Sequence, residues 1–273
     1  MWPALKQAKK TVVFLGVLDD TKAKFNATGF FVTVKGINHL VTAKHVIVDP
    51  NTQKFIDQEL FVFINSSTTN KIIPLSIQEL KQKTGVEWIF HNNTDVDIII
   101  LPFPYLEDWD FKSIPDNLFL SISNLAELYD VFFLSYQPGI NPESKLDPIV
   151  RTGTICIIHE DKTFRIDGSA FPGNSGSPVF KRPSSISYSE KGVTIIGDDK
   201  LAGTFVGVIG EYLPYQDYAI SAQTGRTRII FEENTGISKV WSVDLLNEII
   251  GSKKFQEQLD MVLKVHVPKE PKR

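Results

Sequence analysis

The stretch Phe171-Pro-Gly-Asn-Ser-Gly-Ser-Pro-Val-Phe180 decides how the rest of the chain is interpreted. Gly173 and Gly176 flank Ser175 closely and allow the tight, partly positive-φ path that a protruding hydroxyl requires. Such a turn leaves the backbone amides of Gly173 and Ser175 free to face one concavity, where a developing oxyanion could sit. Taken alone, the stretch also fits an ordinary loop with a solvated serine. A nucleophile requires a base and a carboxylate elsewhere in the chain.

His45 is the candidate base. It lies in Leu40-Val-Thr-Ala-Lys-His-Val46, where an apolar strand opens into a turn or short helix. The other four histidines, His39, His91, His159 and His266, fit ordinary surface or strand positions and lack this setting.

Asp97 is the candidate carboxylate. It begins the apolar run Asp-Ile-Ile-Ile-Leu101, and a carboxylate at the head of a buried strand needs hydrogen-bond donors. Holding one ring N–H of His45 would meet that need. Asp95, two residues earlier on the same strand face, is the rival, and Asp97 is preferred because the apolar run starts directly after it.

These three segments follow one another in the order His, Asp, Ser, and together they resemble trypsin-like serine proteases, most closely the bacterial Deg or high-temperature-requirement branch. The resemblance implies a serine endopeptidase that hydrolyses peptide bonds through an acyl-enzyme. In it, Ser175 attacks, His45 transfers the proton and Asp97 orients His45. The amides of Gly173 and Ser175 would form the oxyanion hole.

Short apolar or alternating runs separated by turns dominate the chain, which favours barrels or sandwiches over βαβ units. With the resemblance, this predicts an all-β fold of two packed six-stranded antiparallel Greek-key β-barrels, as in chymotrypsin, followed by a C-terminal α-helix. The predicted domains are an N-terminal barrel at residues 10–125, a C-terminal barrel at 126–242 and a helix at 243–265 that packs on the barrels. That helix has apolar residues at helical spacing, interrupted near Gly251. Residues 183–200 are expected to form a surface hairpin beside the nucleophile loop.

The resemblance places substrate as an extended strand along Gly207–Gly210, with Ser169, Gly207, Ile209 and Gly210 as substrate-binding residues. Ser169 stands where an aspartate would select basic side chains, so a strong Lys or Arg preference is not expected.

Asn174 stands where zymogens activated by cleavage have an aspartate. A neutral amide cannot form that ion pair, so activation by cleavage is not expected.

Composition excludes several other classes of function. A net charge of −3 argues against a nucleic-acid partner, and the single cysteine, Cys156, fits a reducing compartment. A membrane-spanning helix needs about 20 consecutive apolar residues, and no stretch of the sequence approaches that length. The N-terminal apolar run is also a poor match to the apolar core of a signal peptide. The expected location is therefore the cytoplasm. No ligand spacing for a metal and no phosphate-binding glycine loop is present, so no cofactor is expected.

Three alternatives stay open at this stage. The same fold could capture an extended peptide without cleaving it, or it could be a conditionally active effector whose oxyanion loop is ordered by an unknown activating partner. An esterase or acyl transferase could use the same three residues. The His, Asp and Ser set favours the endopeptidase.

Overall fold

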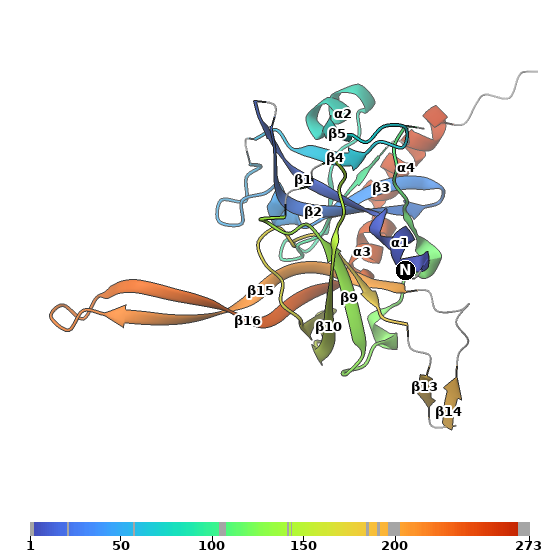
Figure 1. Ribbon diagram of the computed structural model, residues 1–273. Coiled ribbons are helices and arrows are strands. Elements are labelled where there is room, and N and C mark those ends of the chain that lie inside the picture. The colour runs from blue at the N-terminus through green and yellow to red at the C-terminus, as the bar shows by residue number, and fades with distance from the viewer. Residues whose placement is uncertain are drawn as a thin grey trace, which may run out of the picture.

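The computed structural model describes residues 3–20, 22–56, 58–103, 108–140, 142, 144–183, 186–189, 192–195 and 203–266. Two β-sheets make up the body, with helices covering them and one long hairpin projecting from it (Figure 1). Residues 269–273 at the C-terminus and much of the predicted insert at 183–200 lie outside the described residues.

The N-terminal sheet has eight strands in the order β5-β4-β1-β2-β3-β7-β6, and β8 pairs with β2. All pairs but the last are antiparallel. The strands are β1 (Val12–Asp19), β2 (Lys22–Val34), β3 (Ile37–Thr42), β4 (Phe61–Asn65), β5 (Ile72–Ser76), β6 (Ile89–Phe90), β7 (Ile99–Pro102) and β8 (Ile114–Pro115).

The C-terminal sheet is a closed six-stranded barrel in the order β10-β11-β16-β15-β12-β9. Its inward-facing side chains, which include Phe133, Phe164 and Ile166, are fully buried. The strands are β9 (Asp130–Ser135), β10 (Ile149–Ile158), β11 (Thr163–Asp167), β12 (Pro178–Lys181), β15 (Thr204–Ile220) and β16 (Thr227–Ser242). A separate pair, β13 (Ile186–Ser189) and β14 (Gly192–Ile195), forms a small hairpin within the insert.

One apolar core joins the two sheets. Phe30 of β2 and Phe205 of β15 are fully buried, and their ring centroids lie 5.2 Å apart. Burying two such rings contributes about 1.5–3 kcal/mol each, so the sheets hold one another in a fixed relation. The candidate site depends on that relation because it takes residues from both.

The predicted C-terminal helix is present as two helices, α3 (Val243–Gly251) and α4 (Lys253–His266). Ser252 separates them in an extended conformation (φ −69°, ψ 150°), and its Oγ accepts a hydrogen bond from Phe255 N. Phe255 stacks on His39 at 4.9 Å between ring centroids, which fastens α4 to the N-terminal sheet. None of the helices in the described part of the chain has the length and apolar character of a membrane span.

The fold class is confirmed as a mostly β, chymotrypsin-like double barrel with C-terminal helices. The N-terminal sheet has eight strands where six were expected, because two further strands of two residues each add pairings. They are β6, at the end of the sheet beside β7, and β8, which pairs with β2. The division into domains at residue 125 stays a prediction.

Three elements were not expected from the sequence. Helix α1 (Pro3–Lys9) precedes β1, and helix α2 (Ile77–Thr84) follows β5. The third is the length of β15 and β16, which continue far beyond the barrel as a two-stranded hairpin. We call residues 213–234, the projecting part of that hairpin, the arm (Figure 1).

Candidate active site

The pairing of β3 with β7 brings His45 and Asp97 together. Thr42, at the end of β3, pairs with Ile99, at the start of β7. In an antiparallel pair the end of one strand meets the start of the other, so the segments just outside both strands are neighbours. His45 lies in the short 3₁₀ helix Lys44–Val46 after β3, and Asp97 lies two residues before β7.

Asp97 holds His45 through two hydrogen bonds. Its Oδ1 accepts from the backbone N of His45 at 2.8 Å, and its Oδ2 lies 2.7 Å from His45 Nδ1. A carboxylate can only accept, so the proton of the neutral ring lies on Nδ1 and Nε2 keeps a free lone pair. The side chains of His45 and Asp97 are 35% and 18% exposed, so the pair is sheltered but reachable.

The pKa of His45 is raised above its ordinary value. Burial alone would lower it, but the hydrogen bond that His45 donates to Asp97, the charge of Asp97 and the charge of Glu211 together outweigh burial. Each of these carboxylates stabilises the imidazolium form, which is the form that a general base reaches after taking a proton.

Ser175 lies on the turn that leads into β12. Asn174 N donates to Phe171 O at 2.9 Å, and Gly173 has φ +95°. This is the geometry of a type II turn, with Pro172 at its second position and Gly173 at its third, where φ must be positive. Within the described part of the chain, neither Gly173 N nor Ser175 N donates a hydrogen bond to the protein. Both amides are therefore available to an acceptor outside it.

The buried side chain of Asn174 braces this turn from within. Its Nδ2 donates to Tyr136 O at 2.5 Å, and its Oδ1 accepts from Phe171 N at 2.9 Å. Thr28 adds a link from the N-terminal sheet, since its Oγ1 donates to Gly173 O at 2.7 Å. A neutral amide thus holds the loop with hydrogen bonds alone, in agreement with the expectation that no ion pair forms at this position.

The hydroxyl of Ser175 donates to Gly210 O on β15, at 3.2 Å. Across the described residues no hydrogen bond joins Ser175 to His45. Ser177, which stands in place of a second glycine, is fully buried and does not line the pocket in front of Ser175.

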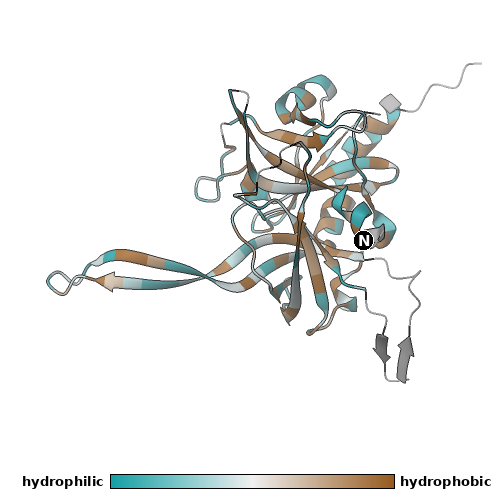
Figure 2. Ribbon diagram, viewed as in Figure 1, coloured by the Kyte–Doolittle hydropathy of each residue, from teal (hydrophilic) through white to brown (hydrophobic). Residues whose placement is uncertain are grey.

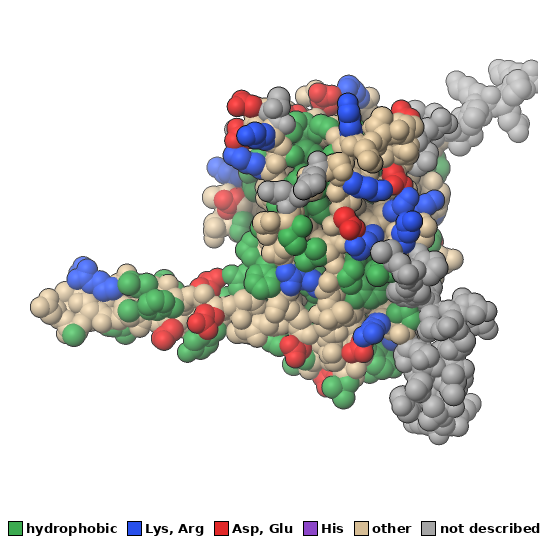
Figure 3. All heavy atoms as spheres, in the orientation of Figure 1, with side chains coloured by type: hydrophobic (Ala, Val, Ile, Leu, Met, Phe, Trp, Pro, Cys, Tyr) green, Lys and Arg blue, Asp and Glu red, His purple; other side chains and the backbone are tan. Residues whose placement is uncertain are grey.

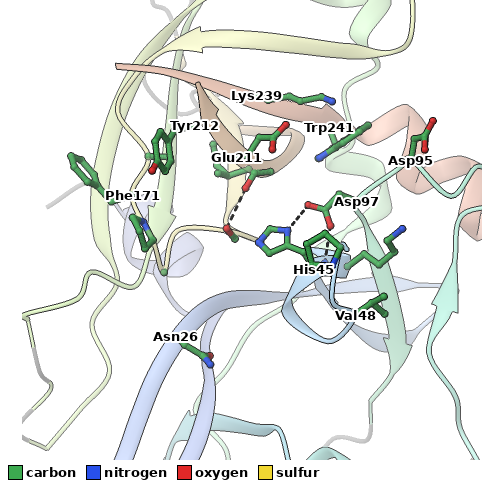
Figure 4. A pocket seen from close by; sticks show the side chains of 18 of the residues that line it. Asn26, His45, Val48, Asp95, Asp97, Phe171, Glu211, Tyr212, Lys239 and Trp241 are labelled. Carbon is green, nitrogen blue, oxygen red and sulfur yellow. Dashed lines mark hydrogen bonds and ion pairs between the residues drawn. The ribbon is translucent and has the colours of Figure 1, made fainter. Parts of the chain in front are cut away.

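His45, Asp97 and Ser175 open onto one pocket with a volume of about 630 Å³, between the two sheets (Figure 4). Besides these three, the residues that line it include Asn26, Lys44, Asp95, Ala170, Phe171, Gly173, Ile209, Gly210, Glu211, Tyr212, Lys239 and Trp241. The site therefore draws on β2, the turns after β3 and before β7, the Ser175 loop, β15 and β16.

Not every candidate residue lines this pocket. Ile209 and Gly210 do, whereas Ser169 and Gly207 are not among its lining residues. Asp95 lines the pocket but is exposed, and Asp97 is the carboxylate that bonds to His45. The substrate-binding roles of Ser169, Gly207, Ile209 and Gly210 stay predictions.

Sequence reasoning missed Glu211 and Trp241. Glu211 follows Gly210 on β15 and acts on His45 through its charge. Trp241 lies beside Gly210, so that a Cβ on Gly210 would come under 3.0 Å from the Trp241 ring nitrogen, and Lys239 Nζ lies 3.8 Å from the centroid of the Trp241 ring. Only the pairing of β15 with β16 brings these residues to the pocket, and nothing in their local sequence signals it.

The described residues contain no group of three or more His, Cys, Asp or Glu side chains placed to hold a metal ion. The pocket brings a serine on a tight turn together with a histidine that is hydrogen-bonded to a carboxylate.

Gly176 is the glycine on which the junction of the two sheets depends most. It has φ +81°, and an added Cβ would lie under 3.0 Å from Thr28 O and Thr42 Oγ1. Gly176→Ala is expected to lower the free energy of unfolding by about 2–5 kcal/mol, through strain and overpacking. Chemical denaturation followed by Trp fluorescence measures this.

Gly225→Ala is the matched control for that variant. Gly225 also has positive φ (+63°), but open space surrounds the position of its Cβ. Its replacement is expected to cost about 1 kcal/mol. Equal losses in the two variants would contradict the tight packing assigned to Gly176.

Comparison with known proteins agrees with this fold and places the chain among the peptidases, a class of hydrolases. The family model of the trypsin-like peptidase domain matches residues 27–184, more than half of the chain. The chain belongs to the trypsin-like peptidase domain family.

Among solved structures, the chain is similar to the serine endoprotease from Yersinia pestis, with 16% sequence identity and a TM-score of 0.49. The match covers 93% of this chain and 66% of that one, and it carries no information about activity. No curated protein matches the chain in sequence.

Proposed function

We propose that the protein is a serine endopeptidase that cleaves peptide bonds through an acyl-enzyme. Ser175 is the nucleophile, His45 is the general base and then the general acid, and Asp97 fixes the tautomer and orientation of His45. The amides of Gly173 and Ser175 receive the oxyanion. No cofactor takes part in this proposal, and the cytoplasmic location expected from the sequence stays a prediction.

The observation that carries the proposal is the pair of hydrogen bonds that His45 donates to Asp97, in the same pocket as Ser175. The bond to His45 Nδ1 leaves Nε2 as the acceptor for the serine proton. The type II turn at Gly173 supports the oxyanion hole, because it orients the central peptide of the turn and leaves the Gly173 amide without a protein acceptor.

The position of the substrate follows from the edges of β15. Up to Ile209 both edges are occupied. On one edge Ile209 N donates to Ser177 O and Ile209 O accepts from Gly176 N, each at 2.9 Å, and on the other edge β15 pairs with β16. Gly210 O is the next carbonyl along, and it accepts the hydroxyl of Ser175. A substrate strand therefore begins its pairing with β15 at Gly210.

This position couples substrate binding to activation. A substrate N–H that bonds to Gly210 O displaces the hydroxyl of Ser175 from that carbonyl. A rotation about χ1 of Ser175 then lets the hydroxyl turn toward His45, which lines the same pocket. The proposal needs no further partner. The bond from Ser175 to Gly210 O also fits a second candidate function, the conditionally active effector, in which this bond marks a resting state that an activating partner would relieve.

The pH dependence of turnover provides one prediction. The free-base form of His45 is required, and its raised pKa places the acid limb of the kcat/KM profile above the ordinary value of about 6.5. Glu211→Gln removes one charge that raises this pKa, so the acid limb is expected to move to lower pH. At pH 6 the variant would keep a larger fraction of its own maximum than the wild type keeps.

Glu233→Gln is the matched control, because it removes a carboxylate on the arm that does not act on His45. Its acid limb is expected to coincide with that of the wild type. An acid limb that Glu211→Gln leaves in place would contradict the assignment of this limb to His45.

Pre-steady-state kinetics with a p-nitrophenyl ester test the acyl-enzyme. A burst of one equivalent of p-nitrophenol per Ser175, followed by a slower steady state, is expected if an acyl-enzyme accumulates. Hydrolysis of the matched peptide amide separates a peptidase from an esterase. Ester turnover with no amide turnover by the folded protein would contradict the proposed function.

A further inference from the structure

The arm presents an unusual amount of apolar surface. Its large apolar side chains are between 43% and 63% exposed. They are Leu213, Tyr215, Tyr218, Ile220, Ile229, Ile230 and Phe231. At about 200 Å² for each fully exposed side chain, these seven present roughly 700 Å² over the two faces of the arm together. The largest single patch on an ordinary monomer is about 300–600 Å², so each face of the arm carries an apolar area comparable to such a patch. Figures 2 and 3 show apolar residues along the arm, with acidic side chains near its base and basic ones near its tip.

The apolar side chains lie on both faces of the arm. Tyr215 pairs with Glu233 and Tyr218 with Ile230, and successive residues of a strand point to opposite faces. Tyr215 and Phe231 therefore share one face, while Tyr218 and Ile230 share the other. A globular partner that lies flat on one face would leave the second face in water. A strand added at the edge would instead place its alternating side chains beside both faces.

One edge of the arm is open to such a strand. Strand β12 pairs with β15 only over Thr204–Val208, and in the described structure β16 is the only strand that pairs with β15 beyond Ile209. The open edge therefore runs for about ten residues, or roughly 33 Å, from Gly210 to Ile220. A lone two-stranded hairpin is at best marginally stable in water, and a third strand stabilises it.

The open edge is continuous with the active site. Gly210, Glu211 and Tyr212 line the pocket of Ser175, and the same strand carries on into the arm. The pairings of β15 with the neighbouring strands β12 and β16 are both antiparallel. An antiparallel strand added here would run from the tip of the arm to the pocket, so its residues on the N-terminal side of the scissile bond would lie along the arm.

We propose that the arm is an extended substrate-binding site that takes an unfolded polypeptide as a third β-strand, guiding its apolar, β-forming segments into the pocket. This proposal rests on the proposed function and adds the substrate class: long unfolded chains rather than short peptides. A second copy of this chain fits the edge less well. The charged residues of the open edge, Glu211 and Asp217, are both acidic, so pairing two copies edge to edge would bring like charges together.

The test measures binding without turnover. The full-length Ser175→Ala protein is titrated against fluorescein-labelled β-casein, an unfolded polypeptide, and fluorescence anisotropy gives the Kd. In this background, Tyr215→Thr, Tyr218→Thr and Ile220→Thr are introduced together, which removes apolar contacts but keeps residues that favour strands. The affinity for casein is expected to fall about tenfold or more.

Val150→Thr with Ile157→Thr is the matched control, since these residues are exposed apolar positions on β10 in the barrel (41% and 40%). It is expected to leave the Kd unchanged. A second arm variant replaces residues 215–233 with Asn-Gly, which joins the paired residues Pro214 and Asn234 by a two-residue turn. It answers the same question if the triple variant fails to fold.

Three outcomes would overturn the proposal. The first is that the Ser175→Ala protein does not bind casein, and the second is that the arm and control variants bind it equally well. The third is that the arm variants convert a dimer to a monomer in light scattering while casein affinity stays the same, which would assign the arm to a second copy. Failure of this proposal can be distinguished from failure of the proposed function. Casein binding that depends on the arm, without any turnover that depends on Ser175, would refute catalysis and support the arm as a binding site.

Discussion

Ser175→Ala is expected to reduce kcat for a peptide amide by about 10⁴–10⁶-fold, with the fold and the binding of substrate retained. The variant lacks the oxygen that forms the acyl-enzyme, while the His45–Asp97 pair and the Gly173 amide stay in place. Only the residual catalysis of oriented binding and oxyanion stabilisation would be left. Initial rates at saturating peptide measure this, and circular dichroism checks the fold.

Ser123→Ala is a suitable control for that experiment. It makes the same change in a short 3₁₀ segment that does not line the pocket, where Ser123 Oγ contacts only Ser121 and Asn124 among the described residues. Its activity is expected to stay within about twofold of the wild type, as is usual for surface substitutions. Loss of activity in Ser123→Ala, or full activity in Ser175→Ala, would remove Ser175 from the role of nucleophile.

Asp97→Asn is expected to lower kcat/KM by about 10⁴-fold while the fold is kept. The backbone N of His45 needs an acceptor, so the amide oxygen of the new side chain would take the place of Oδ1. The amide NH₂ group would then face His45 Nδ1, which must become an acceptor. The ring proton would move to Nε2, and the base would lose the lone pair that it offers to Ser175.

Asp95→Asn distinguishes the two carboxylates considered from the sequence. Asp95 lines the same pocket, but it is exposed and His45 bonds to Asp97 instead. Its replacement is expected to change kcat/KM by less than about threefold, since an exposed charge is screened. A large loss in Asp95→Asn with little loss in Asp97→Asn would transfer the orienting role to Asp95.

The three segments that form the candidate site could be predicted because each has a recognisable local sequence pattern. The three segments around His45, Asp97 and Ser175 each combine a buried strand with a turn, and such combinations are visible in the sequence. The pairing of β3 with β7 then brings the ends of two of them together. The break between α3 and α4 near Gly251 was expected for the same reason, whereas the double barrel was expected from the family resemblance together with the many short strands.

Helix α2 was missed although its signals are present. Ser76 caps its first turn by accepting from Glu79 N, and Gly85 ends it with φ 73°. The spacing from Ser76 to Glu79 is that of a capping box, and a glycine directly after the helix is a common C-cap. The apolar pattern instead predicts a strand that ends at Ile77, because β5 and the first turn of α2 share a run of apolar residues.

The arm could not be predicted by the same reasoning. Strands of a barrel bury one face, so apolar and polar residues alternate along them. In the arm both faces are exposed and both carry apolar side chains, so no alternation marks it as a strand. The sequence accordingly predicts loop packing for the aromatic cluster Tyr212–Tyr218. The effect of the Glu211 charge on His45, and the contact of Trp241 with Gly210, depend on this long pairing and were missed with it.

The most direct test of the central claim is covalent labelling with a serine-directed fluorophosphonate, read by intact mass and peptide mapping. The reagent phosphonylates a serine only where a base accepts its proton and an oxyanion hole stabilises the charge, so labelling reports an assembled site. The account predicts one adduct on the wild-type protein, mapped to Ser175 and absent from both Ser175→Ala and His45→Ala. An unlabelled wild-type protein that is shown to be folded, or an adduct on a different residue, would contradict it.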